Sequence, residues 1–286
     1  MLTSLLAIAI AALTPQDPAG TPGDLTELAS RVDAAHHPKG PVAPITALRA
    51  NLEMHALDTD AKETGQVDLA VRLLQWRRPD RDREQTLIHY EVLEAGSPIV
   101  RGRDRNGPWQ LVQGEAKDLR GAEFGRDLEA CQKHTNLARQ LLRFLDPGAV
   151  LRSLQKPVPV IDEVLAIDRE TKVACRRAEG RLPSFPLLRQ NGDDAPVRLR
   201  VWVGKENGRL VAVEAAPLVG DEPDETRAER VLLLDLHERD DLLVPRKLEH
   251  LFRTQEGRLR LQSRVVFTSL SLRPELRAED FDRPKS

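Results

Sequence analysis

The stretch Leu48–Ala56 reads LRANLEMHA, and apolar side chains alternate in it with polar or charged ones. A period of two places successive side chains on opposite faces of a β-strand, so the stretch predicts a strand with one dry face and one wet face. The same alternation returns in Gln66–Arg78 and Val197–Val203. Most of the apolar residues therefore predict a sheet and not a helical core.

Strands of this kind are expected in both halves of the chain. In the first half they are Gln85–Glu94, Pro98–Arg103 and Pro108–Gln113, the last two joined by a turn whose Asn-Gly pair is typical of a β-hairpin. In the second half we predict strands over Val160–Ile167, Lys172–Glu179, Leu210–Ala215, Arg230–His237, Leu242–Thr254 and Arg258–Leu272, with loops over Leu182–Pro196 and Gly220–Thr226. Strands and helices do not alternate regularly, which argues against a parallel sheet.

Helical spacing is confined to three places. A capped helix is expected to begin at Asp24, an amphipathic helix to cover Ala122–Leu145, and a short helix to cover Ala149–Leu154. We predict an α+β fold: one large curved antiparallel sheet, an incomplete and unclosed β-barrel, with a few helices covering the concave face. No convincing boundary divides residues 24–286, which we treat as a single domain.

The N-terminal segment predicts export. Residues 1–14 contain an apolar run long enough for a secretory signal peptide and too short to span a bilayer, and residues 15–23 are rich in Pro and Gly like a linker. The segment has no Lys or Arg before the apolar run, so a frayed apolar terminus is the alternative. We expect a periplasmic or otherwise exported protein of the bacterial envelope.

Composition and motifs exclude several functions. With 43 Lys and Arg against 45 Asp and Glu, the 286-residue chain has a net charge of −2, so we expect no nucleic-acid partner. The sequence contains no nucleophile elbow, phosphate-binding loop or dinucleotide motif, and its histidines lack metal-ligand spacing. We expect that the protein is not an enzyme and that it binds no cofactor and no metal. Catalysis would become a hypothesis again if His89, His134 or His250 approached a carboxylate in a cleft.

The chain has two cysteines, Cys131 and Cys175. In an exported protein this even pair forms either a disulfide or two buried free thiols, and the sequence leaves both open.

Two stretches carry a resemblance to a known family. Arg103–Trp109 resembles a hairpin with a glycine turn and a tryptophan on the outgoing strand, and Phe267–Phe281 resembles a last strand followed by a closing L-x-x-x-x-F segment. With the order of elements over about residues 24–284, these stretches resemble the LolA-like outer-membrane lipoprotein carriers. The resemblance implies an unclosed barrel capped by helices, whose apolar cavity shields lipoprotein acyl chains.

Strands that are apolar on both faces, notably Gln66–Arg78 and Arg230–His237, indicate either plain core beneath the helices or a cavity with aliphatic walls. Strand faces alone select the candidate cavity residues Leu52, Met54, Val71, Leu73, Ile88, Tyr90, Trp109, Val201 and Phe267. The main hypothesis is a monomeric, cofactor-free protein that holds lipoprotein acyl chains or lipid, with an envelope membrane protein as a further candidate partner. The alternative is a non-catalytic structural or protein-interaction module of the cell envelope.

Overall fold

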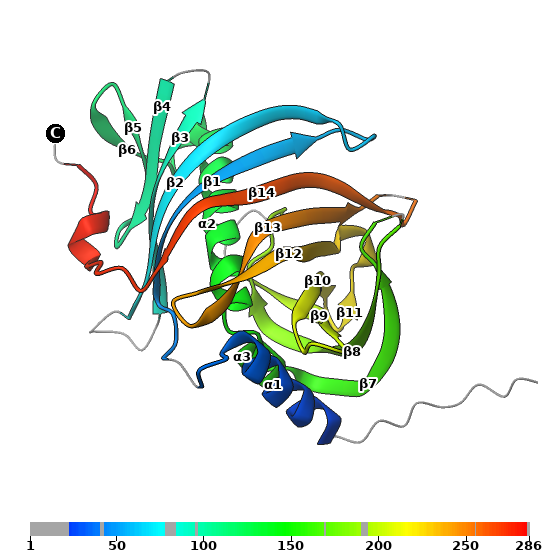
Figure 1. Cartoon of the computed structure of the whole chain (residues 1–286). Coiled ribbons are helices and arrows are strands. Elements are labelled where there is room, and N and C mark those ends of the chain that lie inside the picture. Colours follow the sequence, from blue (N-terminus) through cyan, green and yellow to red (C-terminus); the bar gives the residue numbers. More distant parts are fainter. Residues whose placement is uncertain are drawn as a thin grey trace, which may run out of the picture.

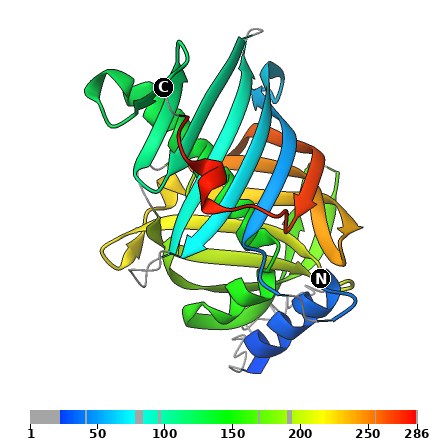
Figure 2. The same cartoon turned by 90° about the vertical axis from the view of Figure 1, so that its left-hand side faces the viewer.

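The computed structural model describes residues 23–40, 43–77, 84–94, 97–168, 170–189, 194–254 and 256–284. Within these residues one antiparallel sheet of fourteen strands bends around a long helix (Figures 1 and 2). The strand order is β6-β5-β4-β3-β2-β1-β14-β13-β12-β10-β9-β8-β7, and the short β11 pairs only with β10. The strands β6 and β7 each have one strand neighbour, so the barrel is not closed. The predicted fold class is confirmed.

The first half of the sheet is a meander in which every strand pairs with the next. Its strands are β1 (Ala47–Leu57), β2 (Glu63–Arg77), β3 (Glu84–Glu94), β4 (Ser97–Asp104), β5 (Gly107–Val112) and β6 (Glu115–Asp118). Five of these six were predicted. The four-residue β6 was not, because it is too short to show an alternation of its own.

The second half contributes the remaining eight strands (Figure 1). They are β7 (Gln155–Ala166), β8 (Lys172–Phe185), β9 (Ala195–Gly204), β10 (Leu210–Val219), β11 (Glu222–Pro223), β12 (Glu229–Arg239), β13 (Leu242–Arg253) and β14 (Leu259–Leu272). The loop prediction for Leu182–Pro196 is wrong at both ends, because β8 continues to Phe185 and β9 begins at Ala195. Likewise, β11 lies inside the predicted loop Gly220–Thr226.

The two halves are joined by pairing between the first and last strands. In the register of β1 with β14, Leu52 lies opposite Phe267 and Met54 opposite Val265. All four side chains are buried in the same hydrophobic core. A contact between segments more than two hundred residues apart thus makes one continuous sheet.

The helices lie where the sheet offers an apolar surface. Helix α2 (Gly125–Phe144), preceded by the short η1 (Ala122–Phe124), runs through the inside of the curve, while α1 (Gly23–His36) and α3 (Pro147–Arg152) lie at one end of it (Figure 1). The short helix expected over Ala149–Leu154 begins two residues earlier, at Pro147, and its N-cap Asp146 accepts a hydrogen bond from the Ala149 backbone N–H. Two short helical turns, η2 (Glu225–Arg227) and η3 (Ala278–Phe281), complete the set.

Two further clusters explain why some strands are apolar on both faces. On the outside of β2 and β3, the C-terminal η3 inserts Phe281, which is fully buried beside Leu87 and packs near Trp76. On the outside of the second half, Trp202, Ala212 and Leu232 lie opposite one another on neighbouring strands and form part of a second cluster. The outer apolar side chains are therefore structural core.

The expected signal peptide, residues 1–14, and all but the last residue of the expected linker, 15–23, lie outside the described residues; Gly23 is the first residue of α1. No helix in the described part of the chain combines the length and apolar character needed to cross a bilayer.

Candidate functional site

The concave interior beneath α2 is the candidate site. All nine predicted cavity residues are buried, and the structure brings eight of them into the same hydrophobic core. Trp109 is the exception. Its ring lies 5.6 Å from that of His89, on the face of β3 and β5 turned away from α2. A Cβ on Gly102 would lie 2.6 Å from the indole, so this glycine makes room for the ring outside the cavity.

A first apolar cavity lies between α2 and the middle of the sheet. Strands β1, β2 and β14 supply its floor, and one face of α2 supplies its roof; the lining residues are Leu48, Ala50, Leu52, Leu69, Val71, His134, Leu137, Ala138, Leu141 and Phe267. Three of the predicted residues, Leu52, Val71 and Phe267, are among them. The free volume is about 10 Å³, close to the space of one water molecule. In this conformation α2 itself fills the concave surface.

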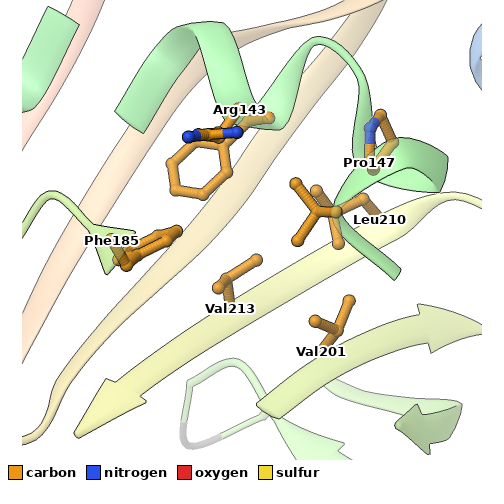
Figure 3. Close-up of a pocket in the computed structure, with 8 residues that line it drawn as sticks. Arg143, Pro147, Phe185, Val201, Leu210 and Val213 are labelled. Carbon is orange, nitrogen blue, oxygen red and sulfur yellow. The ribbon is translucent and has the colours of Figure 1, made fainter. Parts of the chain in front are cut away.

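A second apolar cavity lies at the C-terminal end of α2 (Figure 3). Val201, another predicted residue, lines it from β9 together with Val213 and Leu210 from β10 and Phe185 from the end of β8. Phe144 of α2 is a further lining residue. Its free volume is also about 10 Å³. The predicted set is thus divided between two small cavities at different points along the same helix, with Met54, Leu73, Ile88 and Tyr90 buried in the core around them.

Polar side chains are present on the apolar roof and floor. His134 of α2 packs against Tyr90 of β3 with their ring centroids 4.8 Å apart. Burial lowers the pKa of His134 to about 3 and raises the pKa of Tyr90 well above its usual value, so both are neutral near pH 7. Nearby, Arg101 donates hydrogen bonds to Gln110 and to Asp127 in the first turn of α2.

A short strap, Pro186–Arg189, connects α2 to the sheet. From the helix, the side-chain amide of Asn136 donates to the Leu187 carbonyl and that of Gln140 to the Pro186 carbonyl, each at 2.7 Å. On the other side of the strap, the backbone N–H groups of Leu188 and Arg189 donate hydrogen bonds to the carboxylate of Glu229 in β12, with N–O distances of 2.8 and 2.6 Å. The strap is therefore held between α2 and the sheet by directional contacts. Two ion pairs also attach α2 to the sheet: Asp127 pairs with Arg101 of β4, and Arg139 pairs with Asp194 just before β9.

Two buried titratable groups lie on β12 and β13 near this strap. Burial raises the pKa of Glu229 to about 7, against the opposing effect of the two strap N–H groups. Burial also lowers the pKa of His250 to about 3, and neither ring nitrogen has a hydrogen-bond partner in the described part of the chain. The sequence offered no sign of either environment, because both depend on strand register.

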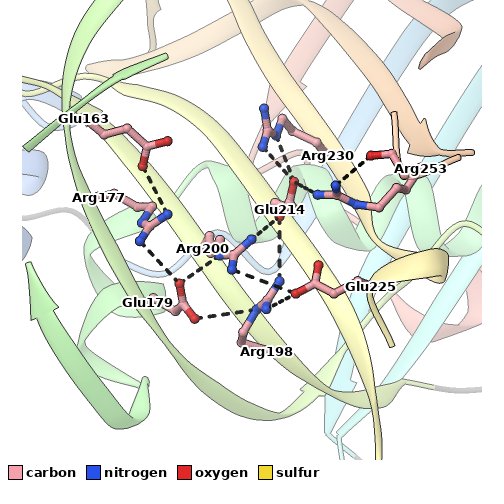
Figure 4. A network of polar contacts seen from close by, with 10 residues as sticks. Glu163, Arg177, Glu179, Arg198, Arg200, Glu214, Glu225, Arg230 and Arg253 are labelled. Atoms are coloured by element: carbon pink, nitrogen blue, oxygen red, sulfur yellow. Dashed lines mark hydrogen bonds and ion pairs between the residues drawn. The ribbon is translucent and has the colours of Figure 1, made fainter. Parts of the chain in front are cut away.

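The outer face of the second half carries a ladder of charges (Figure 4). Glu179, Arg200, Glu214 and Arg230 lie directly opposite one another on β8, β9, β10 and β12. The Glu214 carboxylate is completely buried and lies 3.0 Å from Arg200 and 2.8 Å from Arg230, with Arg198 and Arg253 within 4 Å. Charged pairs opposite each other on neighbouring strands stabilise a sheet, so this ladder strengthens the wall behind the cavities.

The arrangement offers little for catalysis. In the described residues no group of three or more His, Cys, Asp or Glu side chains is placed to hold a metal ion. His89 contacts Arg72 at 2.9 Å and remains 3.8 Å from the Glu91 carboxylate, beyond hydrogen-bonding distance. His134 and His250 have no ion pair with a carboxylate among the described contacts.

The possible disulfide is not formed. Cys131 and Cys175 are both free and buried, the first in the core beneath α2 and the second in the outer cluster around Trp202. The two thiols thus belong to opposite faces of the sheet.

No protein-family model and no curated protein sequence matches the chain. Among solved structures it is similar to a DUF1329 family protein from Desulfovibrio piger, with 11% identity, a TM-score of 0.48, and 92% of this chain and 98% of that one covered. It is also similar to a protein described as an outer membrane lipoprotein-sorting domain, from Vibrio parahaemolyticus (9% identity, TM-score 0.40, 90% and 95% covered). A LolA superfamily protein from Nitrosomonas europaea gives 11% identity, a TM-score of 0.38, and coverage of 91% and 97%. At these values the likenesses do not show what this chain binds.

Proposed function

We propose that this chain is an exported, monomeric, cofactor-free protein of the cell envelope that holds the acyl chains of a lipoprotein or lipid in its concave interior. The observation that carries the proposal is the construction of that interior. A continuous aliphatic floor from β1, β2 and β14 is covered by a single helix, α2, and the two small cavities lie on or beside this interface.

Acyl chains would bind by replacing α2 on the floor. Burial of apolar area stabilises such a complex by about 25 cal/mol per Å² without requiring a hydrogen-bond pattern. The two cavities beneath α2 hold far less than the few hundred Å³ of a typical ligand site, so the helix has to move before a chain enters either of them. Such a movement has to break the hydrogen bonds to the strap Pro186–Arg189 and the ion pairs of α2 with Arg101 and Asp194.

A second candidate is a non-catalytic structural or protein-interaction module, and the small volume of the same cavities favours it. In this case α2 would stay in place and the protein would bind an envelope partner through its surface. The unpaired edge of β7, where Val158 and Val164 are exposed, is a surface of the kind that such partners use.

The two candidates differ in a direct binding measurement. We expect the full-length protein, purified from the envelope fraction, to retain lipid in native mass spectrometry and to bind the fluorescent fatty acid cis-parinaric acid. Leu69→Gln places a polar amide in the cavity floor and should weaken parinaric acid binding at least tenfold. Ala70→Gln makes the same change on the outer face, one residue away, and should leave binding unchanged. Recovery without lipid, together with no binding of parinaric acid, would exclude the carrier.

A further inference from the structure

A groove crosses the outer face of the first half of the sheet, the face turned away from α2. It is lined by the neighbouring strands β14, β1, β2, β3 and β4, and its volume is about 330 Å³. Each cavity beneath α2 holds about 10 Å³, so this outer groove alone among the three has the size of a typical ligand site. Its side chains alternate with core residues: Glu53, for example, lies between the buried Leu52 and Met54.

The strand register brings three carboxylates of the groove together. Glu53 of β1 lies directly opposite Asp68 of β2, and Glu91 of β3 lies opposite Ala70, which places it diagonal to Asp68. Like charges that face each other on neighbouring strands destabilise a sheet. The ladder through Glu214 in the second half follows the opposite rule, because each carboxylate there faces arginines. The first half thus keeps an unfavourable arrangement at the one large groove, as functional sites often do.

The carboxylates of the groove have only weak counter-charges. Within the described residues, none of the three forms an ion pair with a Lys or Arg side chain. Glu53 lies 3.5 Å from His55, and Asp68 accepts a hydrogen bond from a neutral side-chain amide at 3.1 Å. Glu91 lies 3.8 Å from His89, but burial lowers the pKa of this histidine, so its ring is neutral near pH 7. The groove is therefore complementary to a cationic partner.

An unpaired strand edge borders the same groove. The pairing of β2 with β3 ends at Asp68 and Leu93, whereas β2 itself extends back to Glu63. Over Glu63–Val67 this edge of β2 has no strand partner in the described part of the chain. A free edge of this kind accepts an extended peptide. The short η3 covers the opposite end of β2 and β3, around Leu87 (Figure 2).

Apolar surface is also present in the groove. Leu93 is 51% exposed, and the exposed Pro98 lies directly opposite it on β4. A partner that fits all three features is an extended segment in which basic side chains alternate with aliphatic ones.

We propose that the outer groove is the docking site for an extended basic segment of a partner protein, whose Lys or Arg side chains pair with Glu53, Asp68 and Glu91. An aliphatic side chain of the same segment packs on Leu93. The groove and the α2 floor are on opposite faces of the sheet, so this inference does not depend on whether the interior holds acyl chains.

Isothermal titration calorimetry with the synthetic peptide Ac-KLKLK-NH2 tests the docking site. The triple variant Glu53→Gln/Asp68→Asn/Glu91→Gln keeps the side-chain sizes and removes the three charges. It should bind the peptide at least tenfold more weakly than the wild type does. Its urea midpoint should be unchanged or higher, because the like-charge repulsion is removed as well. Affinity of the wild type should fall as the salt concentration rises from about 50 to about 300 mM.

The matched control is Glu222→Gln, which removes an exposed carboxylate from the second half of the sheet and should leave peptide binding unchanged. The peptide Ac-KSKSK-NH2 has the same charge without the aliphatic side chains and should bind the wild type at least threefold more weakly. The docking site is refuted if the wild type does not bind Ac-KLKLK-NH2, if the triple variant binds it no more weakly than Glu222→Gln does, or if the two peptides bind equally well.

Discussion

The contact between α2 and the strap Pro186–Arg189 can be weakened without touching the cavity. Asn136 and Gln140 are each 1% exposed and donate to the strap carbonyls at 2.7 Å, while the cavity roof is formed by other residues of the helix. The double substitution Asn136→Ala/Gln140→Ala removes both donors. While α2 lies on the floor, which we call the closed state, the two strap carbonyls then have no side-chain donor. When α2 moves away, water can satisfy those carbonyls in the variant and the wild type alike.

The expected size of the effect follows from these two bonds. Each contributes about 1 kcal/mol net, so the double variant should favour the open state by about 2 kcal/mol, or roughly 30-fold at 1.36 kcal/mol per factor of ten. Alanine also has a higher helix propensity than asparagine, so α2 itself should remain intact. The opening should therefore become easier although the helix does not unfold.

Stopped-flow uptake of cis-parinaric acid measures this opening. If access is limited by α2, the uptake rate of the double variant should rise by about ten- to thirtyfold, and Gln140→Ala alone should give an intermediate rate. Arg126→Ala, an exposed substitution on the same helix, is the control and should not change the rate. An uptake rate within twofold of the wild type, in a double variant of lower stability toward urea, would show that the interior is not reached by release of α2 from the strap.

Three other predictions concern the stability of the folded protein and the redox state of its cysteines. Glu214→Ala leaves its arginine partners without their buried carboxylate and should lower the free energy of unfolding by about 3–5 kcal/mol in urea titrations. The substitution Glu222→Ala at an exposed position should change it by less than about 0.5 kcal/mol. Equal effects of the two substitutions would refute the role of the ladder. Burial lowers the folded-state pKa of His250 from 6.5 to about 3, so the contribution of the neutral ring to stability is present above pH 6.5 and is lost as the pH falls. Between pH 6.5 and 4.5 the free energy of unfolding of the wild type should therefore fall by about 2–3 kcal/mol relative to that of His250→Leu. Parallel pH profiles of the two proteins would contradict this. Burial raises the pKa of Cys175 to about 11 and also raises that of Cys131, so a thiol reagent should find no reactive thiol in the native protein and two after denaturation without reductant; none after denaturation would indicate a disulfide.

The sequence predicts the strands because their two faces differ chemically. In β9, Val197, Leu199 and Val201 face the core while Arg198 and Arg200 face outward, and this alternation is visible without any knowledge of neighbouring strands. The pairing of β1 with β14 is different. Nothing local in Leu52 or Phe267 specifies the partner, because the register depends on how the whole sheet bends.

The same distinction explains the errors in the candidate site. Strand alternation placed eight of the nine candidate residues in the core. In β5, Trp109 and Leu111 share one face while Pro108, Gln110 and Val112 share the other, so both faces carry apolar side chains and the sequence does not tell which one points inward. Its Trp109 lies outside because the glycine opposite it leaves space there. His134 could have been found: it follows Cys131 by three residues and precedes Ala138 by four, so it lies on the apolar stripe of the helix, where a histidine is unusual.

The distribution of contacts in the molecule indicates which part moves when the interior opens. Behind the cavities the wall is held by backbone pairing, by the outer cluster around Trp202 and by the charge ladder through Glu214, all of which would have to break together if strands separated. Helix α2 is held on its floor mainly by apolar contacts, and an acyl chain can supply the same apolar contacts in its place. Its two hydrogen bonds to the strap are lost for a cost of about 2 kcal/mol, and its ion pairs with Arg101 and Asp194 are exposed to water in the same movement. We therefore expect a ligand to exchange with α2 on an unchanged sheet.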